Sequence, residues 1–189
     1  MSDHVFQHWL TASENNVGRH SLVIISEKDG ARTGIIAELR ATVRSHYVDP
    51  ELTAKRLAFL GAPKTAKLIR EHLPTTKSAR SGDLGEILAT EVAEQQLHYA
   101  VPVRRLRWKD GRNMALRGDD IIGIAREKKS KLMFLKGESK SRAALSAVVL
   151  DEAGAALDSD RGRPTRHSVI FVAERLREHN KNDLAQGNH

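Results

Sequence analysis

The sequence has no cysteine in its 189 residues, and aromatic residues make up only 4% of it. The absence of cysteine excludes disulfides, thiolate metal sites and cysteine nucleophiles. The scarcity of aromatic side chains disfavours a platform on which single-stranded bases stack, so any contact with nucleic acid should run mainly through phosphates. No apolar run approaches the ~20 residues of a membrane span, and residues 1–10 lack the basic-then-apolar pattern of a secretion signal. We therefore expect a cytoplasmic protein without membrane contact.

Several common catalytic and nucleotide-binding motifs are also missing. The sequence contains no GxxxxGK[ST], HExxH, GxSxG or GxGxxG pattern, and each of these patterns carries a specific phosphate, zinc or nucleophile chemistry. If ATP hydrolysis drives the system in which this protein works, the motor must lie on another chain.

The remaining composition is typical of a soluble globular protein that can bury a core, with 40% hydrophobic and 29% charged residues. Lysine and arginine outnumber aspartate and glutamate, which gives a formal net charge of +7. This excess favours an anionic partner, and DNA is the first candidate.

Residues 1–77 are predicted to form an N-terminal αβ accessory region. The elements expected there are a strand at 20–27, a strand or short helix at 33–43, and helices at 50–60 and 63–73. Asp49 suits the N-cap of the first of these two helices, and Pro50 suits its first turn. We find no catalytic arrangement in this region.

Residues 78–189 are predicted to form the core domain and a C-terminal helix. In chain order we expect a helix at 84–97, strands at 103–108, 113–125 and 131–138, and helices at 140–157 and 168–179. Residues 75–81 fit a polar, basic linker, so the first helix would be capped by Ser81 or Asp83. This order predicts a mixed α/β (α+β) fold.

Acidic residues occupy three places in this arrangement: Glu86 in the leading helix, Asp119-Asp120 on the second strand and Glu138 at the end of the third. The interval from Asp120 to Glu138 allows a strand to finish, turn and return antiparallel, which would bring the two carboxylates side by side. Lys140 follows Glu138 by two positions, and alternate side chains of an extended chain share a face. Carboxylates inside an apolar strand are costly to bury, so Asp119-Asp120 is the more informative part of the pattern.

These side chains match the needs of a divalent cation that assists phosphate chemistry. Mg²⁺ is held in proteins by one or two carboxylates together with waters and substrate phosphate. Such an ion lowers the pKa of a bound water and neutralises charge on the reacting phosphate. A nearby lysine can orient or deprotonate that water, or stabilise the developing charge. An isolated Glu-x-Lys is usually a solvated pair at a strand end, but the upstream carboxylates favour a site for Mg²⁺ or Mn²⁺.

Three phrases carry a resemblance to a known family: GDLGE at 82–86, GDDIIG at 118–123 and LKGESK at 135–140. The arrangement resembles the PD-(D/E)xK nuclease superfamily, and the three phrases together resemble the HamA-like proteins over residues 83–157. The resemblance implies an αβββαβ restriction-endonuclease-like core with D…ExK on its second and third strands. It also implies a metal-dependent DNA nuclease, the effector subunit of the bacterial Hachiman anti-phage defence system. Its partner would be a superfamily 2 helicase subunit, HamB, that controls it.

The same resemblance assigns roles to individual positions. Asp120 and Glu138 would be metal ligands, Glu86 the helical acid that also serves the metal, and Lys140 the catalytic lysine. Asp119 is the alternative metal ligand. We prefer Asp120, because Asp120 lies at even spacing from the apolar residues of its strand unless a bulge intervenes. The superfamily core ends in a further strand, and no clear candidate for it follows residue 157.

Two basic clusters accompany these residues: Arg104, Arg105, Arg107, Lys109 and Arg112, and then Lys128, Lys129 and Lys131. Both clusters fit either a solvated face or contacts with DNA phosphates. Two other functions stay open beside the nuclease. One is a catalytically silent nuclease fold that binds DNA or a helicase as an adaptor, and the other is a resolvase or repair nuclease of the same fold.

Overall fold

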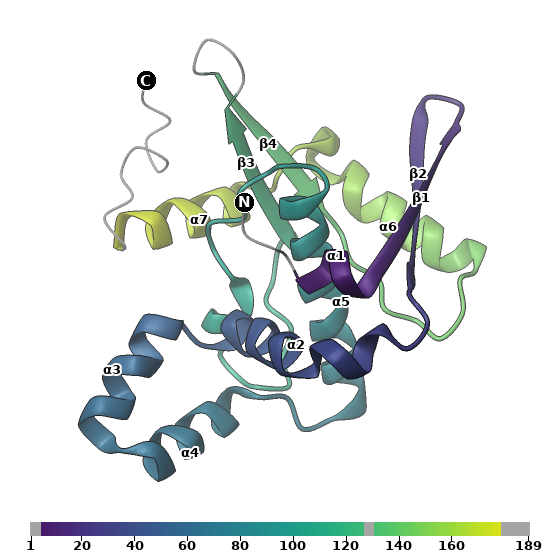
Figure 1. The fold of residues 1–189 in the computed structure, drawn as a ribbon. Coiled ribbons are helices and arrows are strands. Elements are labelled where there is room, and N and C mark those ends of the chain that lie inside the picture. The colour runs from purple at the N-terminus through teal and green to yellow at the C-terminus, as the bar shows by residue number, and fades with distance from the viewer. Residues whose placement is uncertain (1–4, 127–130, 179–189) are drawn as a thin grey trace. The chain divides into compact units, whose positions relative to one another are not determined.

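The computed structural model of the chain describes residues 5–126 and 131–178 (Figure 1). The chain divides into two compact units, residues 1–45 and residues 46–189, and each is considered by itself. All of the predicted site residues belong to the second unit.

The first unit contains a β-hairpin between two helices. Helix α1 (Val5–Trp9) leads into strand β1 (Leu10–Val17), which pairs antiparallel with β2 (His20–Glu27), and α2 (Ala31–Tyr47) follows. Gly18 in the hairpin turn has a φ of 62°, a conformation that glycine adopts at little cost. The strand predicted at 20–27 is confirmed, and residues 33–43, for which strand and helix were both open, are helical.

Three helices begin the second unit: α3 (Pro50–Leu60), α4 (Ala62–His72) and α5 (Lys77–Gln95). The predicted cap of α3 is confirmed, because the Asp49 side chain accepts hydrogen bonds from the backbone N–H groups of Glu51 and Leu52. The linker predicted at 75–81 is wrong. Helix α5 begins there, with Thr76 as its N-cap accepting from the N–H of Ala79. The first turns of α5 are polar and mostly exposed, and a solvated helix end has the composition of a linker.

The first predicted core strand, at 103–108, is also wrong. Residues Arg105–Trp108 form a 3₁₀-helix, η1. The alternation of apolar and arginine residues was typical of a strand, but neighbouring arginines have partners in different directions. Arg104 pairs with Glu94 at 2.6 Å, and Arg107 pairs with Asp49 at 2.8 Å. The basic side chains therefore hold this segment to two separate helices rather than lining one face of a strand.

The second unit contains one antiparallel β-hairpin, built from β3 (Ile121–Arg126) and β4 (Leu132–Gly137). The antiparallel return expected between the second and third strands is present, with Ile121 opposite Gly137. Strand β3 is shorter than the predicted 113–125, so Asp119 and Asp120 precede the strand rather than lying at its middle. An isolated bridge joins Ala100 to Ile124 on the other edge of β3.

The remaining helices are α6 (Ala147–Asp158), the 3₁₀-helix η2 (Ser159–Gly162) and α7 (Arg166–Glu178). The start predicted for α6 at residue 140 or 141 is wrong, because Ser146 caps this helix by accepting from the N–H of Val149. Residues 138–146 are irregular. The final predicted helix is confirmed as α7.

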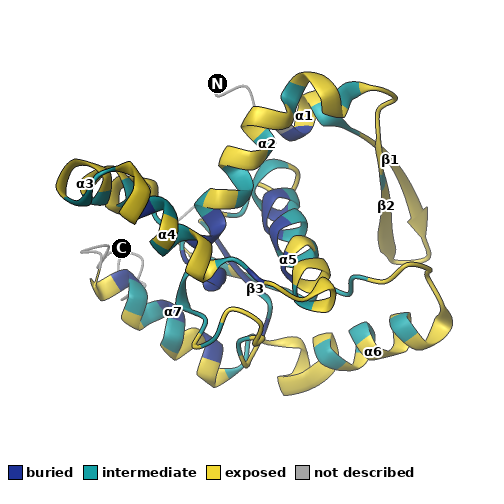
Figure 2. Cartoon of the chain, turned by 90° about the horizontal axis from the view of Figure 1, so that it is seen from below, coloured by how far each residue is buried: buried dark blue, intermediate teal, exposed yellow. Residues whose placement is uncertain are grey.

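Helices pack against both faces of β3. Ile121 lies in a cluster with Ala93 of α5, whereas Ile122 lies in another cluster with Val172 and Leu176 of α7. This alternation is the period-two pattern of a strand buried on both sides. Figure 2 shows buried residues on α5, β3 and α7, while every residue of α3 and α6 is at least partly exposed.

The architecture is therefore α+β, as predicted, with small sheets among many helices. Within the described residues the second unit has a two-stranded sheet where the resemblance implied three or four strands. None of the helices in the described part of the chain combines the length and apolar character that crossing a bilayer requires.

Candidate functional site

The hairpin places two carboxylates at neighbouring positions. Asp120 immediately precedes β3 and Glu138 immediately follows β4, and the register pairs Ile121 with Gly137. Asp120 and Glu138 therefore lie opposite each other, one position beyond the Ile121–Gly137 pair at the end of the hairpin. Asp120 Oδ2 accepts a hydrogen bond from the N–H of Ser139 at 2.9 Å, which ties the start of one strand to the end of the other.

Lys140 lies beside Glu138, as the extended spacing predicted. Its Nζ donates to Glu138 Oε1 at 2.5 Å, and both side chains are partly exposed. This hydrogen bond raises the pKa of Lys140, and the nearby charge of Asp120 adds to the effect. The Lys140 side chain is therefore a charged ammonium group at neutral pH.

Helix α5 supplies the third acidic side chain, Glu86. A cleft of about 390 Å³ is lined by Glu86, Asp120, Glu138 and Lys140 together, so the structure brings all four predicted site residues around one hollow. Burial raises the pKa of Glu86 to about 7, with Arg105 opposing the shift and Asp120 adding to it. Burial also raises the pKa of Asp120, and the Glu138 carboxylate adds to that rise. Burial in the cleft thus disfavours the charged forms of both carboxyl groups.

A glycine allows α5 to approach the Glu138–Lys140 segment closely. A Cβ at Gly85 would lie 2.7 Å from Ser139 Oγ and 3.2 Å from Ser141 Cβ, whereas a Cβ at Gly82 would meet nothing within 4 Å. The hydroxyls of Ser81 and Ser141 join the same two segments at 2.7 Å. Gly85 therefore sets how near Glu86 comes to the other carboxylates.

The two adjacent aspartates have different surroundings. Asp119 is 5% exposed and does not line the cleft. Its Oδ2 accepts from the N–H of Thr165 at 2.7 Å, and its Oδ1 lies 3.5 Å from Lys136 Nζ. Burial alone would raise the pKa of Asp119, but hydrogen bonds from Thr165 and Ser168 outweigh it and hold the pKa below its ordinary value. Asp119 anchors the start of α7, and Asp120 is the aspartate that lines the cleft.

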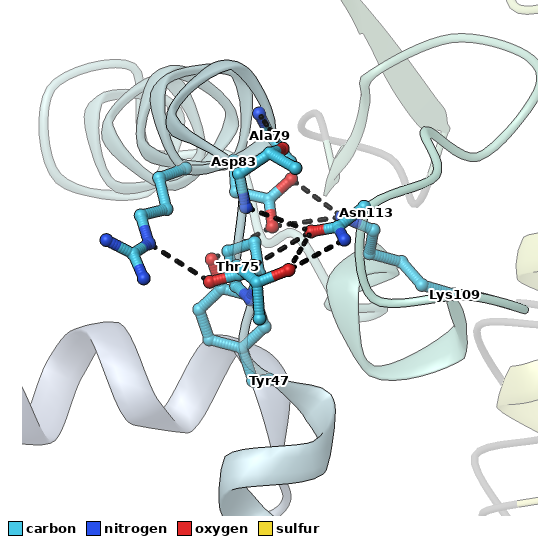
Figure 3. A network of polar contacts seen from close by, with 9 residues as sticks. Tyr47, Thr75, Ala79, Asp83, Lys109 and Asn113 are labelled. Atoms are coloured by element: carbon cyan, nitrogen blue, oxygen red, sulfur yellow. Dashed lines mark hydrogen bonds and ion pairs between the residues drawn. The ribbon is translucent and has the colours of Figure 1, made fainter.

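A buried network that sequence reasoning missed supports the wall of this cleft (Figure 3). Lys109 Nζ contacts both carboxylate oxygens of Asp83, at 2.8 and 3.0 Å, and the Tyr47 hydroxyl donates to Asp83 Oδ2 at 2.9 Å. Nearby, Asn113 Oδ1 accepts from the N–H of Thr75. The available signals were Asp83 of the GDLGE phrase, for which the sequence predicts a helix cap, and Lys109 of a cluster that fits a solvated face or contacts with DNA.

Comparison with known proteins agrees with this arrangement of phrases. A family model described as HamA matches residues 3–186 of the chain. The chain belongs to the HamA family. The curated "Hachiman protein HamA" of Bacillus cereus is 27% identical over 113 residues, which is 60% of this chain and 39% of that relative. The chain thus covers well under two thirds of the length of this HamA protein.

Most side chains of the first basic cluster of this HamA-family chain already have partners within the protein. Besides the pairs of Arg104 and Arg107, Arg105 Nη2 donates to the backbone oxygen of Arg117 at 2.8 Å, and Lys109 is held by Asp83. Arg112 is exposed. In the second cluster, residues 128 and 129 lie outside the described part of the chain, and Lys131 is exposed.

The donor set of the cleft fits a hard divalent cation. Burial raises the pKa of Asp120 and the adjacent Glu138 carboxylate adds to the rise, and a bound cation would favour the ionised form. Among the described residues no three histidine or acidic side chains already converge on a single ion position. Mg²⁺ needs only one or two carboxylates, with water and phosphate oxygens as its other ligands. The assignment of Asp120, Glu138 and Glu86 as ligands stays a prediction.

Proposed function

We propose that this chain is a metal-dependent DNA nuclease of the PD-(D/E)xK type that hydrolyses phosphodiester bonds. The observation that carries the proposal is the convergence of Asp120, Glu138, Lys140 and Glu86 on one cleft. Two carboxylates, a lysine and a helical acid around one hollow form the set that the superfamily resemblance implies. The two-stranded hairpin departs from the full superfamily core, so the proposal depends on the site rather than on the sheet.

The residues of the cleft have complementary tasks in such a reaction. Asp120 and Glu138 would hold Mg²⁺ or Mn²⁺, which lowers the pKa of a bound water and neutralises phosphate charge. Lys140 enters as an ammonium group, because its bond to Glu138 raises its pKa. It is therefore suited to orient the attacking water and to stabilise negative charge on the phosphate. Glu86 can bind or release a proton near neutral pH, since its pKa is about 7.

The family supports the wider setting of this activity. The relative from Bacillus cereus is named as a Hachiman protein, so we propose that this chain is the effector of a two-component anti-phage system. A HamB-like superfamily 2 helicase would then be its partner and would restrain it until abnormal DNA is sensed. The lack of a P-loop in the sequence agrees with a motor on a separate chain.

The test is DNA cleavage with Mg²⁺ or Mn²⁺ by the wild-type chain and by the Glu138→Ala and Lys140→Ala variants. Loss of charge stabilisation and metal binding should lower the rate by roughly 10²–10⁴-fold. Lys131→Ala is the matched control, because this exposed lysine lies at the other end of β4. Circular dichroism and thermal unfolding should show that all variants fold. Cleavage by both site variants at the wild-type rate would refute the site.

A further inference from the structure

A second cavity lies elsewhere in the second unit. It encloses about 220 Å³ and shares no lining residue with the nuclease cleft. Its walls come from α3, the end of α4, the segment 102–108 and α7, and they include Arg56, Arg107 and Arg175. Residues 47–72, the segment 102–108 and α7 thus meet around one hollow.

The lining of this cavity is strongly basic. Four arginines and His72 line it against a single aspartate, Asp49. Asp49 is engaged by Arg107 at 2.8 Å and by the first N–H groups of α3. Arg56 and His72 have no hydrogen-bond or ion-pair partner among the residues that the structure describes. The cavity therefore keeps the unpaired charge of the Arg56 guanidinium at its wall.

Two further arginines have unsatisfied donors. Arg104 pairs with Glu94, and Arg175 pairs with Glu178 at 3.0 Å. Even so, Arg104 Nη1 and Arg175 Nε are buried without a hydrogen-bond partner. Buried guanidinium nitrogens are usually satisfied, and both of these arginines line the cavity.

Much of the remaining cavity wall is apolar. Val48, Leu52, Pro102 and Val103 line it together with Trp108. The Arg175 guanidinium lies 4.4 Å from the centroid of the Trp108 ring, which fixes the indole beside the basic wall. A ligand that fills the cavity would need an anionic group joined to a compact apolar body.

We propose that this cavity binds a nucleoside monophosphate group. A phosphate presents three acceptor oxygens and up to about two negative charges, which suits several converging guanidinium groups better than a carboxylate does. The base supplies flat faces that can pack against the apolar residues of this wall. The group could belong to a free mononucleotide or to the phosphorylated end of a DNA strand.

The cavity and the nuclease cleft share a partition. Arg107 and Trp108 line the cavity, whereas Leu106 and Lys109 of the same segment line the cleft. Tyr47 also lines the cavity, and its hydroxyl donates to Asp83 in the cleft wall. If the proposed function holds, a nucleotide in the cavity would contact the residues that position the cleft.

The test is calorimetric titration of the full chain with dAMP, deoxyadenosine and inorganic phosphate in EDTA, where neither metal binding nor cleavage can contribute. We expect dAMP to bind at least about tenfold more tightly than either fragment, because only dAMP uses both walls. Arg56→Ala should weaken dAMP binding at least about tenfold, the loss expected for a charged hydrogen bond. Lys55→Ala, its exposed neighbour outside the lining, and Lys140→Ala in the nuclease cleft should leave binding unchanged.

A second titration separates the two sources of the phosphate. A short oligonucleotide with a 5′-phosphate that outcompetes its 5′-hydroxyl counterpart identifies a strand end, and failure of both to displace dAMP identifies a free mononucleotide. Either result upholds the site. The proposal is overturned if dAMP does not bind, if Arg56→Ala binds it normally, or if Lys140→Ala abolishes binding, which would locate the nucleotide in the cleft. Binding of an acidic peptide in place of dAMP would also overturn it.

Discussion

Replacing Glu86 by glutamine should make the metal-free protein more stable at alkaline pH while damaging its proposed activity. Glu86 lies in the cleft beside Asp120, and burial raises its pKa from 4.5 to about 7. A carboxyl group with a raised pKa binds its proton more tightly in the native state than in the unfolded chain. Its contribution to stability is therefore greatest below pH 4.5, falls as the pH rises toward about 7, and is constant above that.

The size of the effect follows from the two pKa values. At 1.36 kcal/mol for each pH unit between them, ionising Glu86 costs the native protein up to about 3 kcal/mol at pH 8. Glu86 is partly exposed, so screening by solvent makes this figure an upper bound. Glutamine has nearly the same shape and cannot ionise. The Glu86→Gln variant should gain up to about 3 kcal/mol at pH 8 and about 1 kcal/mol or less at pH 5.

Urea unfolding of both proteins in EDTA at pH 5 and pH 8 measures this difference. The comparison between the two pH values isolates ionisation, because changes in packing and hydrogen bonding are common to both. Asp120 also has a raised pKa, but it is present in both proteins and largely cancels. Added Mg²⁺ should stabilise the wild type more than the variant, since the ion favours the ionised carboxylate. A stability difference between the two proteins that is the same at pH 5 and at pH 8 would refute the reasoning.

Two other predictions concern how the cleft is built. Gly85→Ala should lower activity and metal affinity, because its Cβ would lie 2.7 Å from Ser139 Oγ. Gly82→Ala on the same helix is the control, and it should keep activity and gain roughly 0.5–1 kcal/mol of stability. Normal cleavage kinetics in Gly85→Ala would contradict this role. Lys109→Met should cost about 3–5 kcal/mol in chemical denaturation by leaving buried Asp83 unpaired, and adding Asp83→Asn should recover part of the loss. If Lys109→Met alone were as stable as the wild type, the ion pair between Lys109 and Asp83 would not contribute to stability.

The sequence predicted those parts of the fold that depend on local signals. The Asp49-Pro50 start of α3 and the apolar run of β4 were read correctly, because capping and strand burial leave direct marks in neighbouring residues. The segment 103–108 was misread because its alternating arginines imitate a half-buried strand. Their actual partners, Glu94 and Asp49, are distant in sequence, and tertiary ion pairs leave no periodic signal.

The candidate site was predicted more completely than the fold around it. The phrases containing Glu86, Asp120 and Glu138 lie on separate segments, and the antiparallel register of β3 and β4 follows from the length of the loop between them. The separate duties of Asp119 and Asp120 could only be suggested, since they depend on where β3 begins. The contact of Lys109 with Asp83 could not be foreseen, because it joins a loop to a helix across the cleft wall.

The most direct test of the account is calorimetric binding of Mn²⁺ to the wild-type chain and to its Asp120→Asn and Asp119→Asn variants, with and without a short DNA duplex. Asp120 lines the cleft, and Asp119 is engaged by Thr165 and Lys136. We predict that the wild type binds Mn²⁺, that Asp120→Asn weakens binding at least about tenfold, and that folded Asp119→Asn retains it. Mn²⁺ binding by Asp120→Asn as tight as that of the wild type would contradict the central claim.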